Sequence, residues 1–416
     1  MTDADLTDHQ RALAAADPAM AELIAREQRR RDSGLQLLAA ESVATPAVRA
    51  AMASVLSDKY AEGYPGRRFH GGCAVVDEVE ELARARARAL FGAEYVNVQP
   101  LSWVLANLAV LAAFAKPGDQ LLSLSLRHGG HQTHGSRANS SGRWFNVVNY
   151  GVRRDTEQVD YEKLHELAMI HRPRILVVGG TSYTRLWDLP RLRAIADEAE
   201  CILWVDAAHL AGLVAGGVLA SPVPYADVVT VATNKVIRGP RGGLLLARGE
   251  HAEALDRAVF PFLQGAPAMH AVGAKAVAFA ESATPQFQAY AGEVAGTARD
   301  LVAALAAHGL RPVGGGTDTH LGIVDVSSLG LTGREAAARL AASGIIVDKA
   351  VTPFDAAPVT EGSAIRFGTA AAVAEGLRAA QIPALADLMR AALDAPTDDR
   401  ARHDVVAAEL AALRAE

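Results

Sequence analysis

The sequence predicts an α/β fold, with a large domain on a mostly parallel sheet and a smaller α+β domain after it. Between about residues 75 and 250, helical patterns alternate with short apolar runs: QLLSLSL, WFNVVNY, ILVVGG, CILWVDAAH, VVTVAT and GLLLAR. Such alternation is typical of a parallel sheet covered by helices. After about residue 275 the pattern becomes a helix, then LGIVDVS, GREAAARLAASG, IIVDKA and an alanine-rich helical tail. We expect an N-terminal helical arm over 1–55, a large domain over 56–275 and a small domain over 276–416.

The first helical pattern and the longest apolar stretch have different characters. Residues 7–31 are charged and helical in pattern, with Leu13, Met20 and Leu23 spaced for one face. We interpret this segment as an arm that lies on another surface, such as that of a partner subunit. The stretch from Pro100 to Ala115 is shorter than the ~20 residues that span a bilayer. It predicts a buried helix.

Composition favours small-molecule chemistry. The 416 residues are half apolar by count and carry a formal charge of −6. This balance gives no basic surface for nucleic acid, and no run of Lys or Arg suggests an anionic membrane surface. The acidic N-terminus MTDADLTDHQ lacks the pattern of a secretory signal. With two cysteines, Cys73 and Cys201, that we expect to be packed thiols, the sequence predicts a cytoplasmic protein.

Two predicted strand ends carry the strongest candidates for chemistry, because open α/β sheets bind ligands beyond the carboxyl ends of their strands. Lys235 follows VVTVAT after one residue and precedes a Gly/Pro-rich turn. A lysine fixed to a rigid strand and removed from water is what a Schiff base requires, whereas the alternative is an exposed loop lysine. Asp206 ends ILWVD, three residues before His209. A half-buried carboxylate there can pair with a pyridinium nitrogen, which makes the ring an electron sink, or it can cap a helix.

Three histidines, His128, His131 and His134, lie in LRHGGHQTHG. Their spacing suggests zinc, but nearby thiolates and carboxylates are missing, and the glycines suit a loop pressed against a flat ligand. We therefore expect no metal. We interpret the cluster as a ring that stacks on a cofactor and a group that transfers protons.

Two further segments carry polar candidates. The turn-rich loop YAEGYPGRRFHGG contains Tyr60, Glu62 and His70, and the alternative is an ordinary surface loop. In the small domain, AIRFGTAA contains Arg366. Its planar fork can clamp a substrate carboxylate through two parallel hydrogen bonds, although a surface arginine is the default interpretation.

Together these segments resemble, in the same order from about residue 30 to 390, the serine hydroxymethyltransferase family of fold-type I pyridoxal 5′-phosphate (PLP) enzymes. The resemblance rests on YAEGYPGRR, NVQP, HGGHxTHG, VDxAHxAGL, KxxRGPRGG, GGTDxHL and IRxGT, where x marks a position outside the pattern. It implies a fold-type I transferase with a seven-stranded type of sheet and PLP as cofactor. It also implies a homodimer as the minimum active unit, or a tetramer, with active sites shared between subunits.

Carried over position by position, the resemblance implies a cofactor site and a set of catalytic residues. The cofactor site would comprise the Schiff-base Lys235, Asp206 under the pyridinium nitrogen, His131 stacked on the ring, His209 and Ser182 near the ring oxygen, Tyr60 reaching the phosphate of the partner subunit's cofactor, and Ser102, Trp103, Gln264 and Gly265. The catalytic residues would be Lys235, Glu62, His70, His131 and His134, while Arg366 would bind the substrate carboxylate.

The phosphate-binding segments depart from the family pattern. The family loop after NVQP reads HSGSQAN, whereas this chain has LSWVLAN from Leu101 to Asn107. One phosphate hydroxyl is lost, but Ser102 and the N–H groups at a helix N-terminus can still hold the dianion, so we expect weaker PLP retention. Phe262 and Leu263 stand where two glycines are expected, and Asn234 replaces the histidine before the lysine.

The positions that face folate and substrate also differ. The changed positions, given as found in this chain, are Ala40, Phe69, His70, Gln132 and Ala350. Ala350 replaces the asparagine that recognises the pterin, which removes paired hydrogen bonds at ~1–3 kcal/mol for each unmet group. Tetrahydrofolate binding is therefore doubtful.

The sequence favours a folate-independent aldolase or transaldolase. The expected reaction cleaves or forms the Cα–Cβ bond of L-threonine or L-serine through a glycine quinonoid, as in specialised metabolism. The first alternative is a folate-dependent serine hydroxymethyltransferase. The second is a non-catalytic paralogue, which the retained Lys235, Asp206 and Arg366 argue against. The acceptor aldehyde is not encoded in any pattern.

Overall fold

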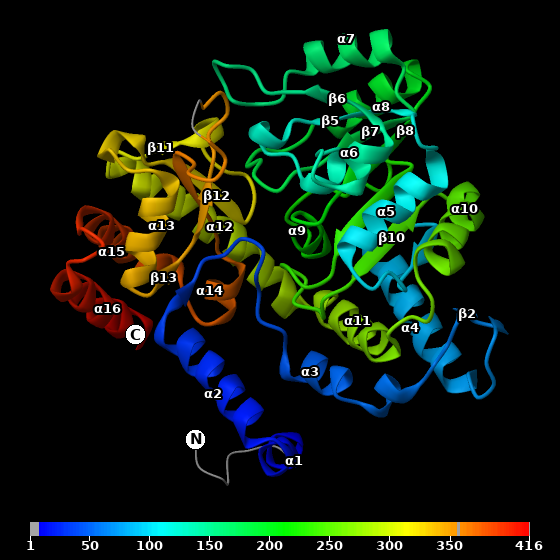
Figure 1. The fold of residues 1–416 in the computed structure, drawn as a ribbon, viewed down its shortest axis with the longest axis horizontal. Coiled ribbons are helices and arrows are strands. Elements are labelled where there is room, and N and C mark those ends of the chain that lie inside the picture. Colours follow the sequence, from blue (N-terminus) through cyan, green and yellow to red (C-terminus); the bar gives the residue numbers. More distant parts are fainter. Residues whose placement is uncertain (1–7, 356–357, 416) are drawn as a thin grey trace.

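A seven-stranded sheet forms the centre of the large domain (Figure 1). The computed structural model describes residues 8–355 and 358–415. The strands follow the order β4-β10-β9-β8-β7-β5-β6. Their bounds are β4 Tyr95–Asn97, β5 Gln120–Leu124, β6 Asn146–Tyr150, β7 Ile175–Val178, β8 Ile202–Asp206, β9 Val228–Ala232 and β10 Gly243–Ala247. Because β10 runs antiparallel to β4 and β9 while the remaining pairs are parallel, the predicted mostly parallel α/β sheet is confirmed.

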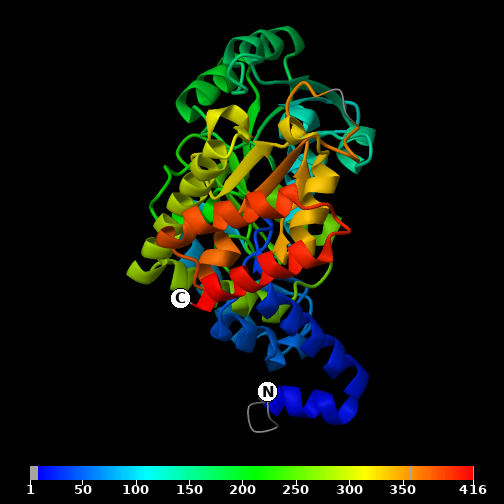
Figure 2. The same cartoon turned by 90° about the vertical axis from the view of Figure 1, so that its left-hand side faces the viewer.

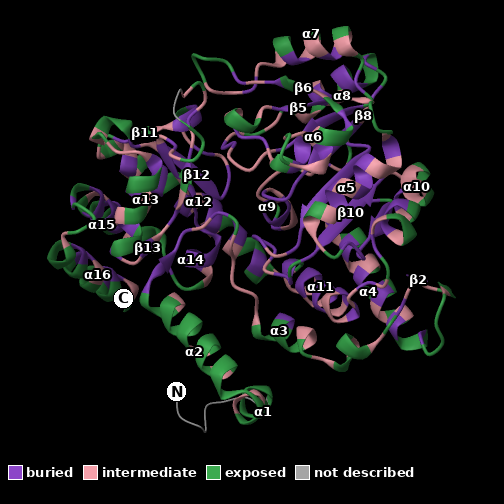
Figure 3. Cartoon of the chain, in the orientation of Figure 1, coloured by how far each residue is buried: buried purple, intermediate pink, exposed green. Residues whose placement is uncertain are grey.

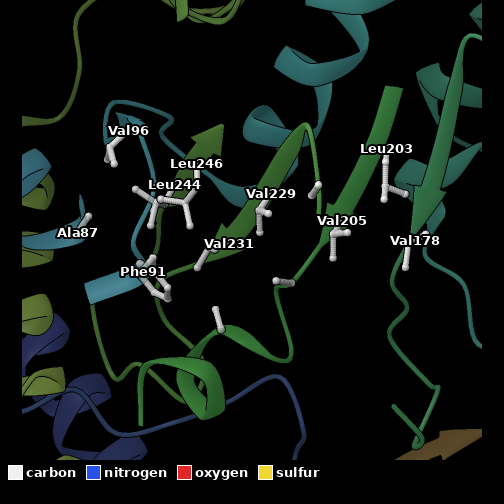
Figure 4. Packing of buried hydrophobic residues seen from close by; sticks show 14 of the residues in the cluster. Ala87, Phe91, Val96, Val178, Leu203, Val205, Val229, Val231, Leu244 and Leu246 are labelled. Carbon is white, nitrogen blue, oxygen red and sulfur yellow. The ribbon is translucent and has the colours of Figure 1, made fainter. Parts of the chain in front are cut away.

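The strands of this sheet are buried on both faces. Along β8, Leu203 and Val205 pack in one core cluster, whereas Trp204 packs in another with residues of α5 (Trp103–Phe114). Figure 4 shows the first of these clusters, in which side chains of neighbouring strands gather near Phe91. Since side chains alternate along a strand, Asp206 at the end of β8 lies on the α5 side, with Trp204. The alternation thus directs Asp206 toward the N-terminal half of α5.

Helices cover both faces of the sheet, and the predicted buried helix is α5. On the α5 side lie α10 and the segment after it, whereas α4, α11 and α9 lie on the other side. The helices of the large domain are α3 Pro46–Met52, α4 Ala74–Phe91, α5 Trp103–Phe114, α6 Ser140–Trp144, α7 Tyr161–His171, α8 Leu189–Glu198, α9 Ala211–Ala215, α10 Ala252–Arg257 and α11 Met269–Ser282. Residue 275, the expected domain boundary, falls inside α11, which packs on α4 and α3.

The small domain is built on an antiparallel sheet of order β11-β12-β15-β14. Its strands are β11 Arg311–Pro312, β12 Leu321–Asp325, β14 Asp348–Ala350 and β15 Ala364–Gly368. Its helices are α12 Pro285–Ala307, α13 Gly333–Ala342, α14 Ala370–Ala374, α15 Ile382–Asp394 and α16 Arg400–Ala415. A separate core cluster that includes Leu301, Val324 and Met389 holds these elements together.

The N-terminal segment protrudes and then returns to both domains. It forms two helices, α1 (Asp8–Ala16) and α2 (Pro18–Ser33), that project from the body in both views and are mostly exposed (Figures 2 and 3). The helical pattern expected over residues 7–31 is confirmed from Asp8 onward, but it forms two helices, because Asp17 caps α2 by accepting from the Met20 N–H and Pro18 starts the new helix. Beyond α2, β1 (Leu35–Gln36) pairs in parallel with β13 (Ile345–Ile346).

The described residues contain no helix that is both long and apolar enough to cross a membrane. Cys73 and Cys201 are free and buried, as the sequence predicted.

Candidate active site

Glycines bring two loops against the carboxyl end of β8. Gly179, with φ of +128°, lies so close to Asp206 that an added Cβ would come within 2.4 Å of the Asp206 carbonyl oxygen. Gly129, with φ of +101°, packs in the same way on Ser182, where a Cβ would lie 2.6 Å from the carbonyl oxygen. A side chain at either position would separate the loops. The glycines therefore hold the histidine loop and the loop after β7 next to the β8 end.

Asp206 is the most connected side chain of the site. Its carboxylate is buried and accepts from Trp103 Nε1 at 2.9 Å, Asn107 Nδ2 at 2.8 Å and the Ala208 N–H at 3.1 Å. It also contacts His134 Nε2 at 2.8 Å. Burial alone raises its pKa, but the hydrogen bonds from His134 and Asn107 and the nearby histidines hold the pKa below the usual value. Asp206 is thus ionised and fully buried, not half-buried, and α9 uses Leu210 as its N-cap instead.

Lys235 is buried beside Asp206, which rules out the exposed-loop alternative. The residue is 7% exposed, and its Nζ lies 4.7 Å from the centre of the Trp103 ring. Burial, with a smaller effect of Arg366, lowers the pKa of Lys235 to about 7 against the opposing attraction of Asp206. A sizeable fraction of the amine is therefore neutral near pH 7, as a nucleophilic lysine requires.

The indole of Trp103 fills the middle of this group. Besides its hydrogen bond to Asp206, the ring lies 4.3 Å from the His131 ring, centre to centre, at an angle of 50°. Lys235 Nζ lies over the face of the indole ring. One tryptophan side chain thus contacts the carboxylate, the imidazole and the lysine that the sequence assigned to a cofactor ring.

The three histidines of the LRHGGHQTHG segment do not all lie at the site. His134 binds Asp206, and His131 contacts Trp103 and accepts from the Thr133 N–H at 3.2 Å. Burial lowers the pKa of His131 to about 4. His128 instead packs on Phe354, with ring centres 4.7 Å apart, and accepts from a backbone N–H. Two of the three therefore lie at the site.

A second pair of histidines links the large domain to the small one. His209 Nδ1 lies 3.3 Å from His320 Nε2 with the rings stacked, and His320 Nε2 also faces the carbonyl of Ala39 at 3.2 Å. Because a carbonyl only accepts, we assign the proton of His320 to Nε2. His209 Nε2 then faces the hydroxyl of Thr181 at 3.4 Å. Ser182, expected beside His209, uses its backbone N–H to bind the Gly129 carbonyl.

Burial of these imidazoles has a consequence for pH. It lowers the pKa of His131 to about 4 and of His320 to about 3, and it lowers the pKa of His209. The unfolded chain takes up protons at these sites near pH 6.5, whereas the folded protein does not, so stability is full above about pH 6.5 and falls on acidification.

We expect the free energy of unfolding of the cofactor-free protein to fall by about 2–5 kcal/mol between pH 7 and 5. Urea unfolding at the two pH values measures it. His320→Gln should flatten the dependence, whereas His165→Gln, at a partly exposed histidine paired with Glu198, should leave it unchanged. Equal urea midpoints at pH 7 and 5 would contradict this.

Arg366 reaches the site from β15 but is already paired. Its Nη1 donates to the Thr181 carbonyl at 2.6 Å and to the Thr181 hydroxyl at 2.8 Å, and its Nη2 lies 2.5 Å from Asp348 Oδ2. The Arg366 side chain is 12% exposed and that of Asp348 35%. A substrate carboxylate must therefore compete with Asp348 for the guanidinium.

The loop over residues 60–72 is held next to the segment before α5. Glu62 Oε2 lies 3.1 Å from His70 Nε2, and Tyr60 packs edge-on against the same imidazole while staying 58% exposed. Gly265 adjoins Glu62, since an added Cβ would lie 3.0 Å from Glu62 Oε1. Gln264 accepts from the Leu101 N–H at 3.1 Å. These residues form one group at the start of α5.

Comparison with known proteins decides the family. The family model described as serine hydroxymethyltransferase matches residues 13–389. This chain belongs to the serine hydroxymethyltransferase family. Two relatives carry that name: one from Acidobacterium capsulatum is 48% identical over 382 residues, covering 92% of this chain and 90% of the relative, and one from Myxococcus xanthus is 47% identical over 391 residues, covering 94% of both.

Membership of the serine hydroxymethyltransferase family confirms the predicted fold-type I, PLP-dependent transferase. The donor set of this site suits that cofactor, because Asp206, His131 and the buried Lys235 lie together. The space between these groups does not suit the cofactor, because a ring that touched all three of them would overlap the indole of Trp103. In the conformation described, the site therefore does not accommodate the cofactor ring.

Three features of the site were not predicted from the sequence. Trp103 was among the residues expected to bind the cofactor. However, the expected contact was made by N–H groups at the helix N-terminus and not by the indole. Asp348 and Thr181, which occupy Arg366, were absent from the prediction. The one available signal was a bulky indole where the family loop has glycine, directly before an apolar helix.

Proposed function

We propose that this chain cleaves and forms the Cα–Cβ bond of a serine-type β-hydroxy-α-amino acid, as hydroxymethyl transfer from serine. The observation that supports this most is that the indole of Trp103 contacts both Asp206 and Lys235, with Arg366 near enough to lower the pKa of Lys235, in a member of this family. The names of the relatives favour hydroxymethyl transfer over the folate-independent aldolase expected from the sequence. The proposed reaction requires the state in which Trp103 has left the ring site.

In this proposal each side chain has a task that its surroundings suit. Lys235, with a pKa of about 7, offers a neutral amine near neutral pH. Arg366 binds the substrate carboxylate after its ion pair with Asp348 has opened. The Glu62–His70 pair, joined at 3.1 Å, carries a proton to or from the substrate hydroxyl.

Folate-independent cleavage of threonine is a second candidate, and Ala350 favours it. This alanine replaces the pterin asparagine of the family and is packed in an apolar cluster with Ala39 and Leu321. The test supplies excess PLP with L-serine or L-threonine, with and without tetrahydrofolate, and measures glycine and the released aldehyde. Serine cleavage that depends on tetrahydrofolate supports hydroxymethyl transfer. Acetaldehyde from threonine without folate supports the second candidate, and no glycine from either amino acid contradicts both.

Asp348→Asn is expected to lower the KM for the amino acid about three- to tenfold with little change in kcat, because Arg366 loses its competing carboxylate. The pair is partly exposed, and an interaction of about 1 kcal/mol corresponds to roughly fivefold. Steady-state kinetics measure it. Asp325→Asn is the matched control, because Asp325 pairs with Arg311 in the same sheet. An unchanged or raised KM for Asp348→Asn would contradict the carboxylate role of Arg366.

We further propose a homodimer with shared sites. Several apolar side chains of the large domain are exposed in the single chain, namely those of Val55, Tyr60, Phe69 and Phe262. The arm adds Met20, Leu23 and Ile24, each about half exposed. Such surfaces suit a partner subunit. Light scattering on the purified chain distinguishes monomer, dimer and tetramer. Two buried free thiols fit a reducing compartment such as the cytoplasm.

A further inference from the structure

We infer that the indole of Trp103 is an internal competitor of PLP, which binds at this site only after that side chain has rotated away. The inference rests on the proposed function, because it concerns the cofactor of that reaction. Its starting point is that the indole makes, within one chain, the contacts expected of the cofactor ring.

The chemical match between indole and cofactor ring is close. Trp103 Nε1–H donates to Asp206 Oδ1 at 2.9 Å, where a protonated pyridine nitrogen would donate to the same carboxylate. The flat indole contacts the His131 ring, with centres 4.3 Å apart. Its π face lies 4.7 Å from the amine of Lys235. A planar ring with one N–H donor is the common feature of the two groups.

The indole supplies a second hydrogen-bond donor to Asp206 Oδ1. Asp206 is buried. Without Trp103, its Oδ1 would still accept a hydrogen bond from the Ala208 N–H but would lose the one from the indole. A charged acceptor in a buried site strongly favours a second donor. Trp103 therefore stabilises the cofactor-free protein, and the cofactor must replace both this hydrogen bond and the aromatic contact.

The backbone beneath Trp103 is fixed, so opening must come from the side chain. Pro100 carbonyl accepts from the Gly243 N–H at 3.0 Å and from Lys275 Nζ at 3.1 Å. Ser102 carbonyl lies against Gly243, where an added Cβ would be 2.5 Å away. A shift of this loop would break these contacts. Rotation about the side-chain bonds of Trp103 leaves them intact.

Exposed apolar residues at the start of α5 could contact the indole after it has rotated. Trp103 is the first residue of α5, and its side chain is partly exposed. Its neighbours Leu101 and Val104 are exposed apolar residues, at 43% and 36%. An indole turned out of the site would lie near apolar side chains at the helix start.

The test measures PLP binding to the full-length protein by spectroscopic titration, for wild type and Trp103→Gly. We expect Trp103→Gly to bind PLP at least about tenfold more tightly, because no hydrogen bond or ring contact has to be broken first. Trp103→Phe, which keeps a ring but lacks the N–H, should lie in between. Trp144→Ala, at an exposed tryptophan elsewhere, is the control with unchanged affinity.

Two further measurements apply if Trp103→Gly weakens the fold. Added indole should refill the space, raising the melting temperature of Trp103→Gly and weakening its PLP binding, with neither effect in wild type. In wild type, PLP should change the fluorescence contributed by Trp103, taken as the difference from Trp103→Phe.

The outcomes separate the inference from the proposed function. Equal PLP affinity of wild type and Trp103→Gly, with the cofactor attached to Lys235 in both, overturns the inference and leaves the function standing. A folded Trp103→Gly that binds indole but no PLP overturns both.

Discussion

Replacing Asp206 with alanine is expected to lower the free energy of unfolding of the cofactor-free protein by about 3–5 kcal/mol. The substitution removes the acceptor of three polar groups: the partly exposed indole N–H of Trp103, one N–H of the buried Asn107 amide, and the buried His134 imidazole. Unmet buried groups cost more than the hydrogen bonds themselves contribute, so the loss should be larger than at a typical site.

Urea unfolding followed by circular dichroism measures this loss. Asp155→Ala is the control, because Asp155 is an exposed aspartate whose ion pair with Arg153 lies at the surface, and its effect should stay within about 0.5 kcal/mol. Asp206→Asn keeps the shape and one acceptor, so it should fall between alanine and wild type. A loss below about 1 kcal/mol for Asp206→Ala would show that the carboxylate does not organise this network.

Replacing Lys235 with alanine is expected to reduce kcat/KM by roughly 10³-fold or more at saturating PLP, because the proposed reaction needs a covalent amine at this position. Lys235→Arg is the informative companion, since it keeps a cation but lacks the primary amine, and it should be equally inactive. Lys349→Ala, at an exposed lysine that donates to the Thr360 carbonyl, is the control with near-normal kinetics. Activity of Lys235→Ala within tenfold of wild type would exclude this role.

Much of the large domain follows from its apolar runs. Strands such as ILWVD and VVTVA are buried on both faces and too short for helices, so both their existence and their parallel arrangement were predictable. The short strand β4 was not, because Tyr95–Asn97 offers three residues and no periodicity. The antiparallel direction of β10 was not either, since a fully apolar strand reads alike in both directions.

Some residues of the site were likewise predictable from the sequence, whereas others were not. Asp206 and Lys235 were predictable because Asp206 ends β8 and Lys235 lies three positions after the end of β9, and the apolar runs define both strand ends. Contacts that join distant segments were not predictable: Arg366 meets Thr181 across 185 positions, and the rotamer of Trp103 decides what fills the site. Sequence gives the size of an indole but not its direction. The folded chain supplies that direction through the carboxylate of Asp206.

Borohydride reduction of Trp103→Gly loaded with PLP, followed by peptide mass analysis, tests most directly whether Lys235 carries the cofactor. We expect one pyridoxyl group per chain, on Lys235, and markedly less label on wild type at the same subsaturating PLP concentration. A label on a different lysine, or none on a folded Trp103→Gly, would contradict the assignment of Lys235 as the residue that carries the cofactor.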